Sequence, residues 1–150
     1  MTRDRHTVMA GAAALPQAEG SGPPDGSKTQ DRYRRGLDQL TAISGPQGAA
    51  VIESLNDIAP DLGRYIVEFA YGDVFARPGL DVKTRELATV AALTAMGTAA
   101  PQLKVHMRAA LRVGASRQEI VETVMQMIPY AGFPAALNAI GIARDAFATE

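Results

Sequence analysis

The chain has 150 residues, of which 47% are hydrophobic and 21% are charged, and its formal net charge at pH 7 is −1. These values are ordinary for one globular domain with a real core. The near-neutral charge and the 5% aromatic content argue against a nucleic-acid partner, which selects a basic surface and stacking side chains.

Three further classes of site are excluded or disfavoured by composition. The absence of Cys excludes disulfides, thiolate metal sites and Cys nucleophiles, and it is consistent with the cytoplasmic location that we expect. The two histidines, His6 and His106, are too few for a multi-histidine metal site in one chain. No apolar run approaches the ~18 residues that a membrane-spanning helix needs, so we expect no membrane segment.

The first 30 residues differ in composition from the rest. Segment 17–30 is rich in Gly, Pro, Ser and charged residues, and such a segment buries too little apolar area to offset the entropy lost on ordering. We therefore predict a flexible tail over residues 1–30 and a single domain over residues 31–150. The first three helices of this domain are predicted from helical spacing of apolar residues over 30–43, 48–58 and 61–71.

The middle of the domain contains a turn and a helix of unusual composition. A turn over 72–76 and a loop over 77–80 precede Asp81, which is a suitable N-cap for a helix that ends at Met96. Segment 87–96 is apolar on every face, as is typical of a helix that is buried on all sides. It is too short to cross a membrane, so we predict that it is the core helix of the fold or of an oligomer.

Three further helices are predicted in the remainder of the chain. Ser116 and Glu119 form the pattern of a capping box, which marks the start of a helix. Proline at first turns and glycine after last turns mark the other boundaries. The predicted helices cover 101–113, 116–131 and 134–148. Because no alternating strand pattern is present, the predicted fold class is all-α with short connections.

Two titratable residues lie on helix faces that are otherwise apolar. His106 shares a stripe with Leu103, so it is either a core histidine with one local hydrogen bond or a general acid or base that titrates near neutrality. Glu86 lies on the row that continues to Val90. The helix dipole explains a carboxylate in the first turn, and a polar group at the mouth of a pocket fits the same position. Both interpretations stay open for both residues.

Arginines are candidates for binding a carboxylate, because a guanidinium group can donate two parallel hydrogen bonds to it. Arg77 lies in a loop, where functional groups are common, and Arg85 lies in the first turn of a helix. Arg108 also belongs to a basic i, i+4 row with Lys104 and Arg112, which is typical of a solvated helix face.

The junction before the last helix is a candidate for stabilising an anion. Backbone amides near Phe133 and Pro134, at the start of that helix, could bind an oxyanion, and Tyr130 could donate a hydrogen bond there. The same residues can also be explained without a function, as the end of one helix followed by the start of the next.

Six segments together resemble the carboxymuconolactone decarboxylase family, and their order and spacing hold over residues 31–148. They are FAYGDVFARPGL at 69–80, Thr84-Arg85, QLKVHMRAA at 102–110, Gly114, Glu119-Ile120 and YAGFPAA at 130–136. The wider superfamily includes alkylhydroperoxidase D-like proteins, which use a Cys-x-x-Cys shortly before the matching histidine. Segment 97–102 contains no Cys, so thiol peroxidase activity is disfavoured.

The resemblance implies a fold, an assembly and a set of site residues. The implied fold is a compact multi-helix, alkylhydroperoxidase D-like bundle that forms homo-oligomers, trimers or hexamers, with pockets between subunits. The implied catalytic residues are His106, Glu86 and Tyr130. The implied substrate-binding residues are Arg77, Arg85, Arg108, Phe133 and Pro134, and no metal or other cofactor is implied.

The function implied by the resemblance is the cofactor-independent decarboxylation of 4-carboxymuconolactone or a similar unsaturated lactone or keto acid, in aromatic catabolism by the β-ketoadipate pathway. Loss of carbon dioxide pushes electrons into the conjugated lactone carbonyl, so the protein must bind carboxylates, stabilise the enolate oxygen and deliver a proton. One alternative is a cofactor-free isomerase, cyclase or hydrolase of a secondary metabolite, with Glu86 as base. Another is a non-enzymatic oligomeric binding protein.

Overall fold

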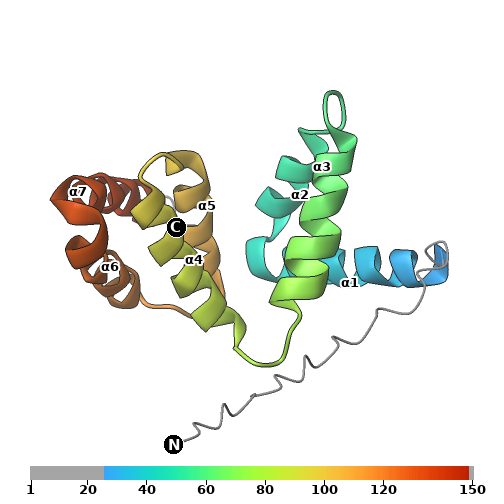
Figure 1. Ribbon diagram of the computed structural model, residues 1–150, viewed down its shortest axis with the longest axis horizontal. Coiled ribbons are helices and arrows are strands. Elements are labelled where there is room, and N and C mark those ends of the chain that lie inside the picture. The colour runs from blue at the N-terminus through green and yellow to red at the C-terminus, as the bar shows by residue number, and fades with distance from the viewer. Residues whose placement is uncertain (1–25, 149–150) are drawn as a thin grey trace, which may run out of the picture.

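The computed structural model describes residues 26–148, which form helices and no strand, so the all-α prediction is confirmed. The helices form two groups, joined by a loop over 76–81 (Figure 1). The N-terminal group contains α1 (Gly26–Ser44), α2 (Pro46–Glu53), α3 (Pro60–Tyr65) and the π-helix η1 (Ile66–Phe75). The C-terminal group contains α4 (Val82–Met96), α5 (Ala100–Arg112), α6 (Arg117–Gln126) and α7 (Ile128–Phe147). None of these helices is long and apolar enough to span a membrane.

The first two helices differ from their predicted bounds. The tail predicted over 1–30 lies largely outside the described residues, and 26–30 are the start of α1 instead. A helix that is anchored by packing can extend beyond the segment whose own propensity favours it. The second helix was predicted over 48–58 but ends at Glu53. The Ser54 hydroxyl donates a hydrogen bond to the Val51 carbonyl at 2.7 Å. Such bonds from a side chain to the nearby backbone compete with the backbone hydrogen bonds of a helix.

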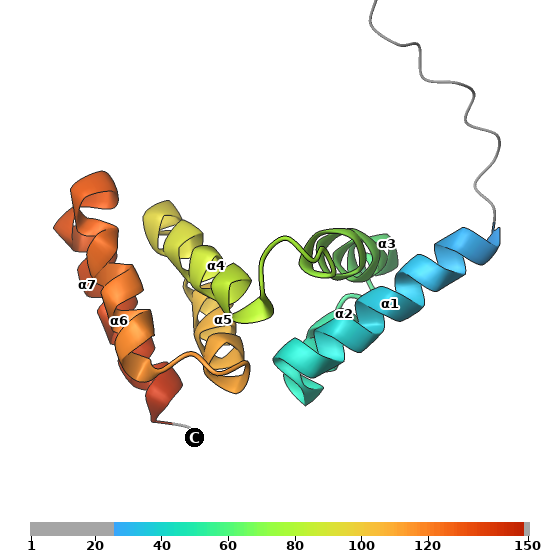
Figure 2. The same cartoon turned by 90° about the horizontal axis from the view of Figure 1, so that it is seen from below.

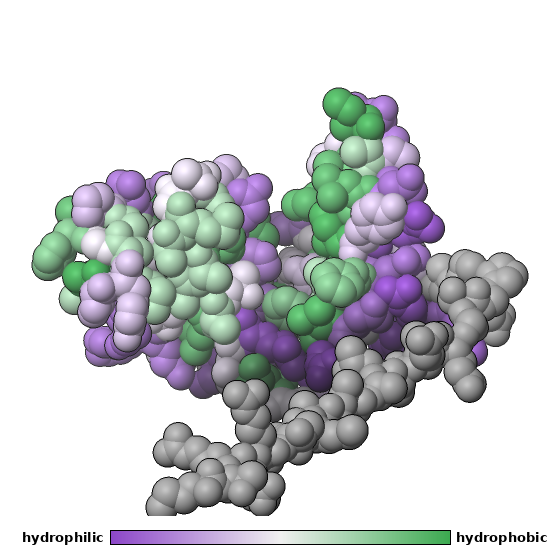
Figure 3. All heavy atoms as spheres, viewed as in Figure 1, coloured by the Kyte–Doolittle hydropathy of each residue, from purple (hydrophilic) through white to green (hydrophobic). Residues whose placement is uncertain are grey.

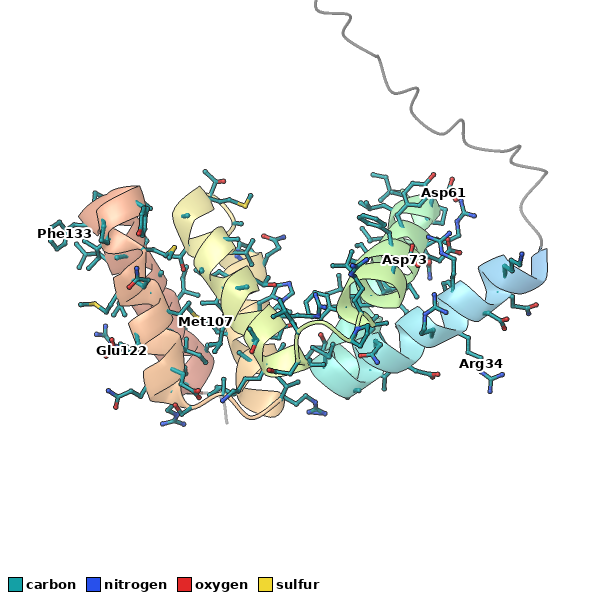
Figure 4. All side chains as sticks on the ribbon, turned by 60° about the horizontal axis from the view of Figure 1, so that its bottom comes forward. Arg34, Asp61, Asp73, Met107, Glu122 and Phe133 are labelled. Carbon is teal, nitrogen blue, oxygen red and sulfur yellow. The ribbon has the colours of Figure 1, made fainter. Side chains whose placement is uncertain are left out.

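The C-terminal group is held together by one apolar core. Val90, Leu103, Met107 and Ile120 are buried in it, one or two from each of the first three helices of the group. Met107 is labelled between the helices in Figure 4. The fourth helix, α7, contributes small side chains at i, i+3 and i+4 spacing, which let it pack closely.

Helix α4 is buried on one side only in the single chain, so the prediction of a helix buried on all sides is wrong here. Its buried row consists of Glu86, Val90 and Thr94, whereas Ala92 and Met96 are exposed. The reason is that α5, α6 and α7 all pack against the same side of it. The predicted N-cap is confirmed, because the Asp81 carboxylate accepts a hydrogen bond from the Thr84 amide at 2.8 Å.

The predicted break between the last two helices, at 131–134, lies inside α7, and a separate, earlier break after Gln126 was not predicted. The capping box is confirmed: Ser116 and Glu119 exchange hydrogen bonds of 2.7 and 3.1 Å. Helix α6 ends at Gln126, however, and the predicted stop at 131–132 is a kink inside α7, where Gly132 has a φ of 83°. A left-handed glycine followed by Pro134, which has no N–H to donate, produces such a kink.

The third helix also continues past its predicted end at residue 71. Segment 72–76 was predicted to be a turn, but η1 winds through it to Phe75. The cause is close packing against α1: a Cβ on Gly36 would lie 1.9 Å from the Val67 carbonyl oxygen, and one on Gly72 would lie 2.8 Å from the Arg32 carbonyl oxygen. The two backbones therefore touch at this crossing, which is visible in Figure 2.

An ion pair ties the start of α4 to the start of α6 and gives a testable pH dependence. Lys83 Nζ lies 2.8 Å from Glu119 Oε1. This hydrogen bond, with the Ser116 amide, lowers the pKa of Glu119 from an ordinary 4.5 to about 2. Because folding lowers the pKa, the ionised carboxylate stabilises the fold above pH 4.5, and the contribution is lost as the pH falls from 4.5 towards 2.

We therefore expect Glu119→Gln to lose less thermal stability than the wild type between pH 4.5 and 2, although it is less stable at neutral pH. Melting curves recorded by circular dichroism across this range measure the effect. Glu122→Gln, an exposed change on the same helix that is labelled in Figure 4, is the matched control and should follow the wild type. Parallel losses in the wild type and Glu119→Gln would contradict the assignment.

Candidate active site

A cavity of about 430 Å³ lies between the N-terminal group and the start of α5. Figure 3 shows the surface hollowed between the two groups, with apolar residues on the side of α2 and α3 that faces the hollow. The cavity is lined by Leu40, Ser44, Gly48, Val51, Ile52, Ile66, Ala70, Tyr71, Phe75, Thr89, Pro101, Gln102, Val105 and His106. A mostly apolar wall with a few polar groups is typical of a small-molecule site.

The structure brings His106 and Glu86 together. Nδ1 of His106 lies 2.8 Å from Oε2 of Glu86, across the contact between α5 and α4. His106 forms part of the cavity wall, and its side chain is 21% exposed. Because Nδ1 is bonded to the carboxylate, Nε2 is the ring nitrogen left for a ligand. His106 therefore makes one hydrogen bond, as expected of a core histidine, and it also lines the cavity, as expected of a general acid or base.

Glu86 lies behind His106 and does not itself line the cavity. Its side chain is 0% exposed, and Oε1 receives no hydrogen bond from the described residues. A buried carboxylate is costly unless a positive or hydrogen-bonding partner compensates for its lost hydration. The carboxylate thus orients the ring and favours the tautomer with its proton on Nδ1, as the third member of a nucleophile–base–carboxylate arrangement does.

The three candidate arginines lie in two places. Arg77 and Arg85 lie together at the start of α4, where Arg85 Nη2 donates to the Arg77 carbonyl at 2.9 Å, and neither lines the cavity. Arg108 lines a neighbouring cavity of about 390 Å³, together with Arg112. The two cavities share Ser44 and Val105. Of the three arginines, Arg108 is therefore the one that lies beside the His106 cavity. Its basic i, i+4 row is typical of a solvated helix face, but the side chain lines a cavity instead.

The structure does not bring Tyr130, Phe133 and Pro134 to His106. All three are exposed at the start of α7, with exposures of 77% for Tyr130 and 68% for Phe133. Phe133 projects from the edge of the molecule that is farthest from α1 (Figure 4). Within the described part of one chain, neither cavity includes any of them.

Sequence reasoning missed Tyr71 and Ser44 as site residues. Tyr71 lines the cavity and is 7% exposed, and its hydroxyl lies 3.4 Å from Ser44 Oγ. Tyr71 is part of the FAYGDV motif, but the predicted third helix ended at this residue. The local sequence contains no signal for the π-helix that turns Tyr71 towards the cavity. Ser44 was interpreted only as part of a helix stop.

The arrangement is suited to transferring a proton to a ligand in an apolar cavity. His106 offers a nitrogen whose charge Glu86 can compensate, and the adjoining arginines offer positive charge to an anion. In residues 26–148, no group of three or more His, Asp or Glu side chains is placed to hold a metal ion.

Comparison with known proteins agrees with the motifs. Residues 60–145 match the profile of the "Carboxymuconolactone decarboxylase family". The chain is 36% identical over 119 residues to a 4-carboxymuconolactone decarboxylase of Acinetobacter baylyi, covering 79% of this chain and 88% of that protein. It is 39% identical over 100 residues to an uncharacterized 15.0 kDa protein of Paracoccus denitrificans, covering 66% and 75% of the two chains. It is also 37% identical over 75 residues to a nitrosuccinic acid decarboxylase of Metarhizium robertsii, covering 50% and 52%.

Proposed function

This chain belongs to the carboxymuconolactone decarboxylase family and is a carboxy-lyase, and we propose that it decarboxylates 4-carboxymuconolactone or a similar unsaturated lactone or keto acid without a cofactor. The observation that carries the proposal is the His106–Glu86 pair at the wall of an apolar cavity. We place the reaction in the catabolism of aromatic compounds, as the resemblance implies.

The proposed reaction needs an electron acceptor in the substrate and a proton from the protein. The bond between the departing carboxylate and its carbon breaks, carbon dioxide leaves, and the electron pair moves through the double bond into the lactone carbonyl. His106 Nε2 then gives a proton to carbon, and Glu86 stabilises the imidazolium that precedes this transfer. An apolar wall favours the step because it disfavours the charged carboxylate relative to neutral carbon dioxide.

Arg108 is proposed to bind a carboxylate that the substrate keeps. It lines the cavity adjoining that of His106, and the two cavities share Ser44 and Val105 as wall residues. We propose that one ligand extends from His106 to Arg108 past this shared wall. Bidentate binding at that end would fix the orientation of the substrate relative to His106. Arg77 and Arg85 are less suitably placed, because neither of them lines either cavity.

The two alternatives receive less support. An isomerase, cyclase or hydrolase with Glu86 as the base needs that carboxylate to touch the ligand, but Glu86 lies behind His106. A binding protein without catalysis has no need of the His106–Glu86 pair. The buried carboxylate of this pair lowers the stability of the fold, so a catalytic role explains it better.

We also propose that the chain acts as a homo-oligomer, a trimer or hexamer as the resemblance implies. Exposed apolar side chains support this: Leu62, Tyr65 and Phe69 on the N-terminal group, and Tyr130 and Phe133 on α7. Patches of this kind on a monomer are typical of interfaces. A contribution of Tyr130 or Phe133 to the cavity would have to come from a neighbouring copy.

Incubation of the purified chain with 4-carboxymuconolactone tests the function. We expect the ultraviolet absorbance of the lactone to change together with the release of one equivalent of carbon dioxide. Nitrosuccinic acid and a β-keto acid serve as second and third substrates, because each carries a carboxylate whose loss pushes electrons into an acceptor group. If none of the three releases carbon dioxide faster than a buffer blank, the proposed function is wrong.

A further inference from the structure

Tyr71 is a buried polar residue of the cavity that the reaction described above does not use. Its ring stacks on Phe75, with centroids 5.2 Å apart, and its hydroxyl lies 3.4 Å from Ser44 Oγ. Ser44 belongs to the walls of both cavities. The Tyr71 hydroxyl therefore lies close to the point where the His106 cavity and the Arg108 cavity meet.

The π-helical winding of η1 is what turns Tyr71 towards the cavity. The four cavity-lining residues of η1 are Ile66, Ala70, Tyr71 and Phe75. With 3.6 residues per turn these positions would spread over about half of a helix circumference. In a helix closed by i→i+5 bonds, with about 4.4 residues per turn, they fall within about a quarter of it. The contact of Gly36 and Gly72 with the facing backbones stabilises this segment against α1.

The ionisation of Tyr71 suits a hydrogen-bond donor rather than a proton donor. Burial raises the pKa of Tyr71 above its ordinary 10.0, the hydrogen bond with Ser44 offsets part of this, and the negative charge of Glu86 raises it further. The phenol therefore stays protonated at neutral pH. Its role is therefore distinct from that of His106, which gives a proton to carbon.

We propose that Tyr71 is a further catalytic residue, whose hydroxyl donates a hydrogen bond to the substrate oxygen that becomes negative as carbon dioxide leaves. This inference rests on the proposed function. The carbon–carboxylate bond breaks, its electron pair reaches the acceptor oxygen, Tyr71 keeps its proton while bonding that oxygen, and His106 supplies the proton that carbon receives. Ser44 is a positioning residue, which holds the hydroxyl at the junction of the cavities.

Tyr71→Phe removes only the hydroxyl and tests the proposal. A hydrogen bond to a developing anion that is lost in a buried site lowers kcat roughly 10- to 100-fold. We expect KM to change by less than about threefold, because the bond forms mainly in the transition state. The matched control is Tyr33→Phe, the same change at an exposed tyrosine of α1 that lines neither cavity, which should keep wild-type kcat. Wild-type kcat in Tyr71→Phe would overturn the proposal.

Binding of 4-nitrophenolate gives a second readout that does not depend on turnover. This anion presents an oxygen like that of the enolate, and a hydrogen bond to it shifts its absorbance. We expect the wild type and Tyr33→Phe to bind it with that shift, and Tyr71→Phe to bind it about 10-fold more weakly with a smaller shift. The same result without turnover of any acid would support Tyr71 as an oxyanion donor and reject the decarboxylase proposal. Failure of the wild type to bind it, or equal binding by both tyrosine variants, would overturn the inference about Tyr71.

Discussion

Replacement of His106 by Ala is expected to lower kcat on the decarboxylation substrate at least ~100-fold, which is a typical contribution of a general acid or base. The reason is that His106 lines the cavity with one ring nitrogen placed to give a proton to a ligand, while Glu86 bonds its other nitrogen at 2.8 Å. Steady-state carbon dioxide release by wild type and variant measures the effect.

The same change is expected to destabilise the fold, and this must be separated from the catalytic loss. Without the imidazole, neither oxygen of the fully buried Glu86 has a hydrogen-bond donor among the described residues. An unsatisfied buried group costs about 1–3 kcal/mol, and more when it is charged. We therefore expect His106→Ala combined with Glu86→Gln to recover the part of the lost stability that is due to the unpaired charge, in urea denaturation, without recovering activity.

Lys104→Ala is the matched control for His106, because it changes the same helix outside both cavities. It should keep wild-type kcat and stability. A folded His106→Ala variant with near-wild-type kcat would contradict the role of His106 as the proton donor. An active double variant would show that neither member of the pair handles the proton.

Gly36→Ala is expected to lower the free energy of unfolding by roughly 2–3 kcal/mol, the upper part of the range for overpacking a core. A methyl group there would lie 1.9 Å from the Val67 carbonyl oxygen, 2.7 Å from the Val67 carbonyl carbon and 3.1 Å from the Gly72 amide nitrogen. These are backbone atoms, which cannot rotate away as a side chain can. Helix α1 would therefore have to move away from η1, and the cavity wall that carries Tyr71 would move with it.

Gly141→Ala is the matched control for Gly36, because both glycines lie inside α-helices and nothing lies within 4 Å of the Cβ position at Gly141. There the same change should stabilise the chain by up to about 1 kcal/mol, through helix propensity alone. Urea denaturation of both variants gives the comparison. Equal or greater stability of Gly36→Ala would mean that α1 and η1 do not touch as described.

Local signals in the sequence predicted the helix starts well and the helix ends less well. The caps at Asp81 and Ser116 depend on hydrogen bonds within three residues, so the sequence alone contains them. The continuation of η1 to Phe75 depends on packing against α1 as well as on local residues. The predicted turn over 72–76 failed because contact with α1 at Gly36 compensates for the poor helix propensity of Gly72.

The sequence by itself determined the fold class, excluded thiol chemistry, and placed His106 and Glu86 on otherwise apolar helix faces. It could not show that these two side chains meet, because they are 20 residues apart and their contact depends on how α4 packs against α5. Tertiary structure alone decided three further points: Glu86 lies behind His106, Tyr71 lines the His106 cavity, and Arg108 lines the cavity beside it. The physical reason is that a helix face is encoded within a few residues, whereas the neighbour of that face is set by the packing of the whole chain.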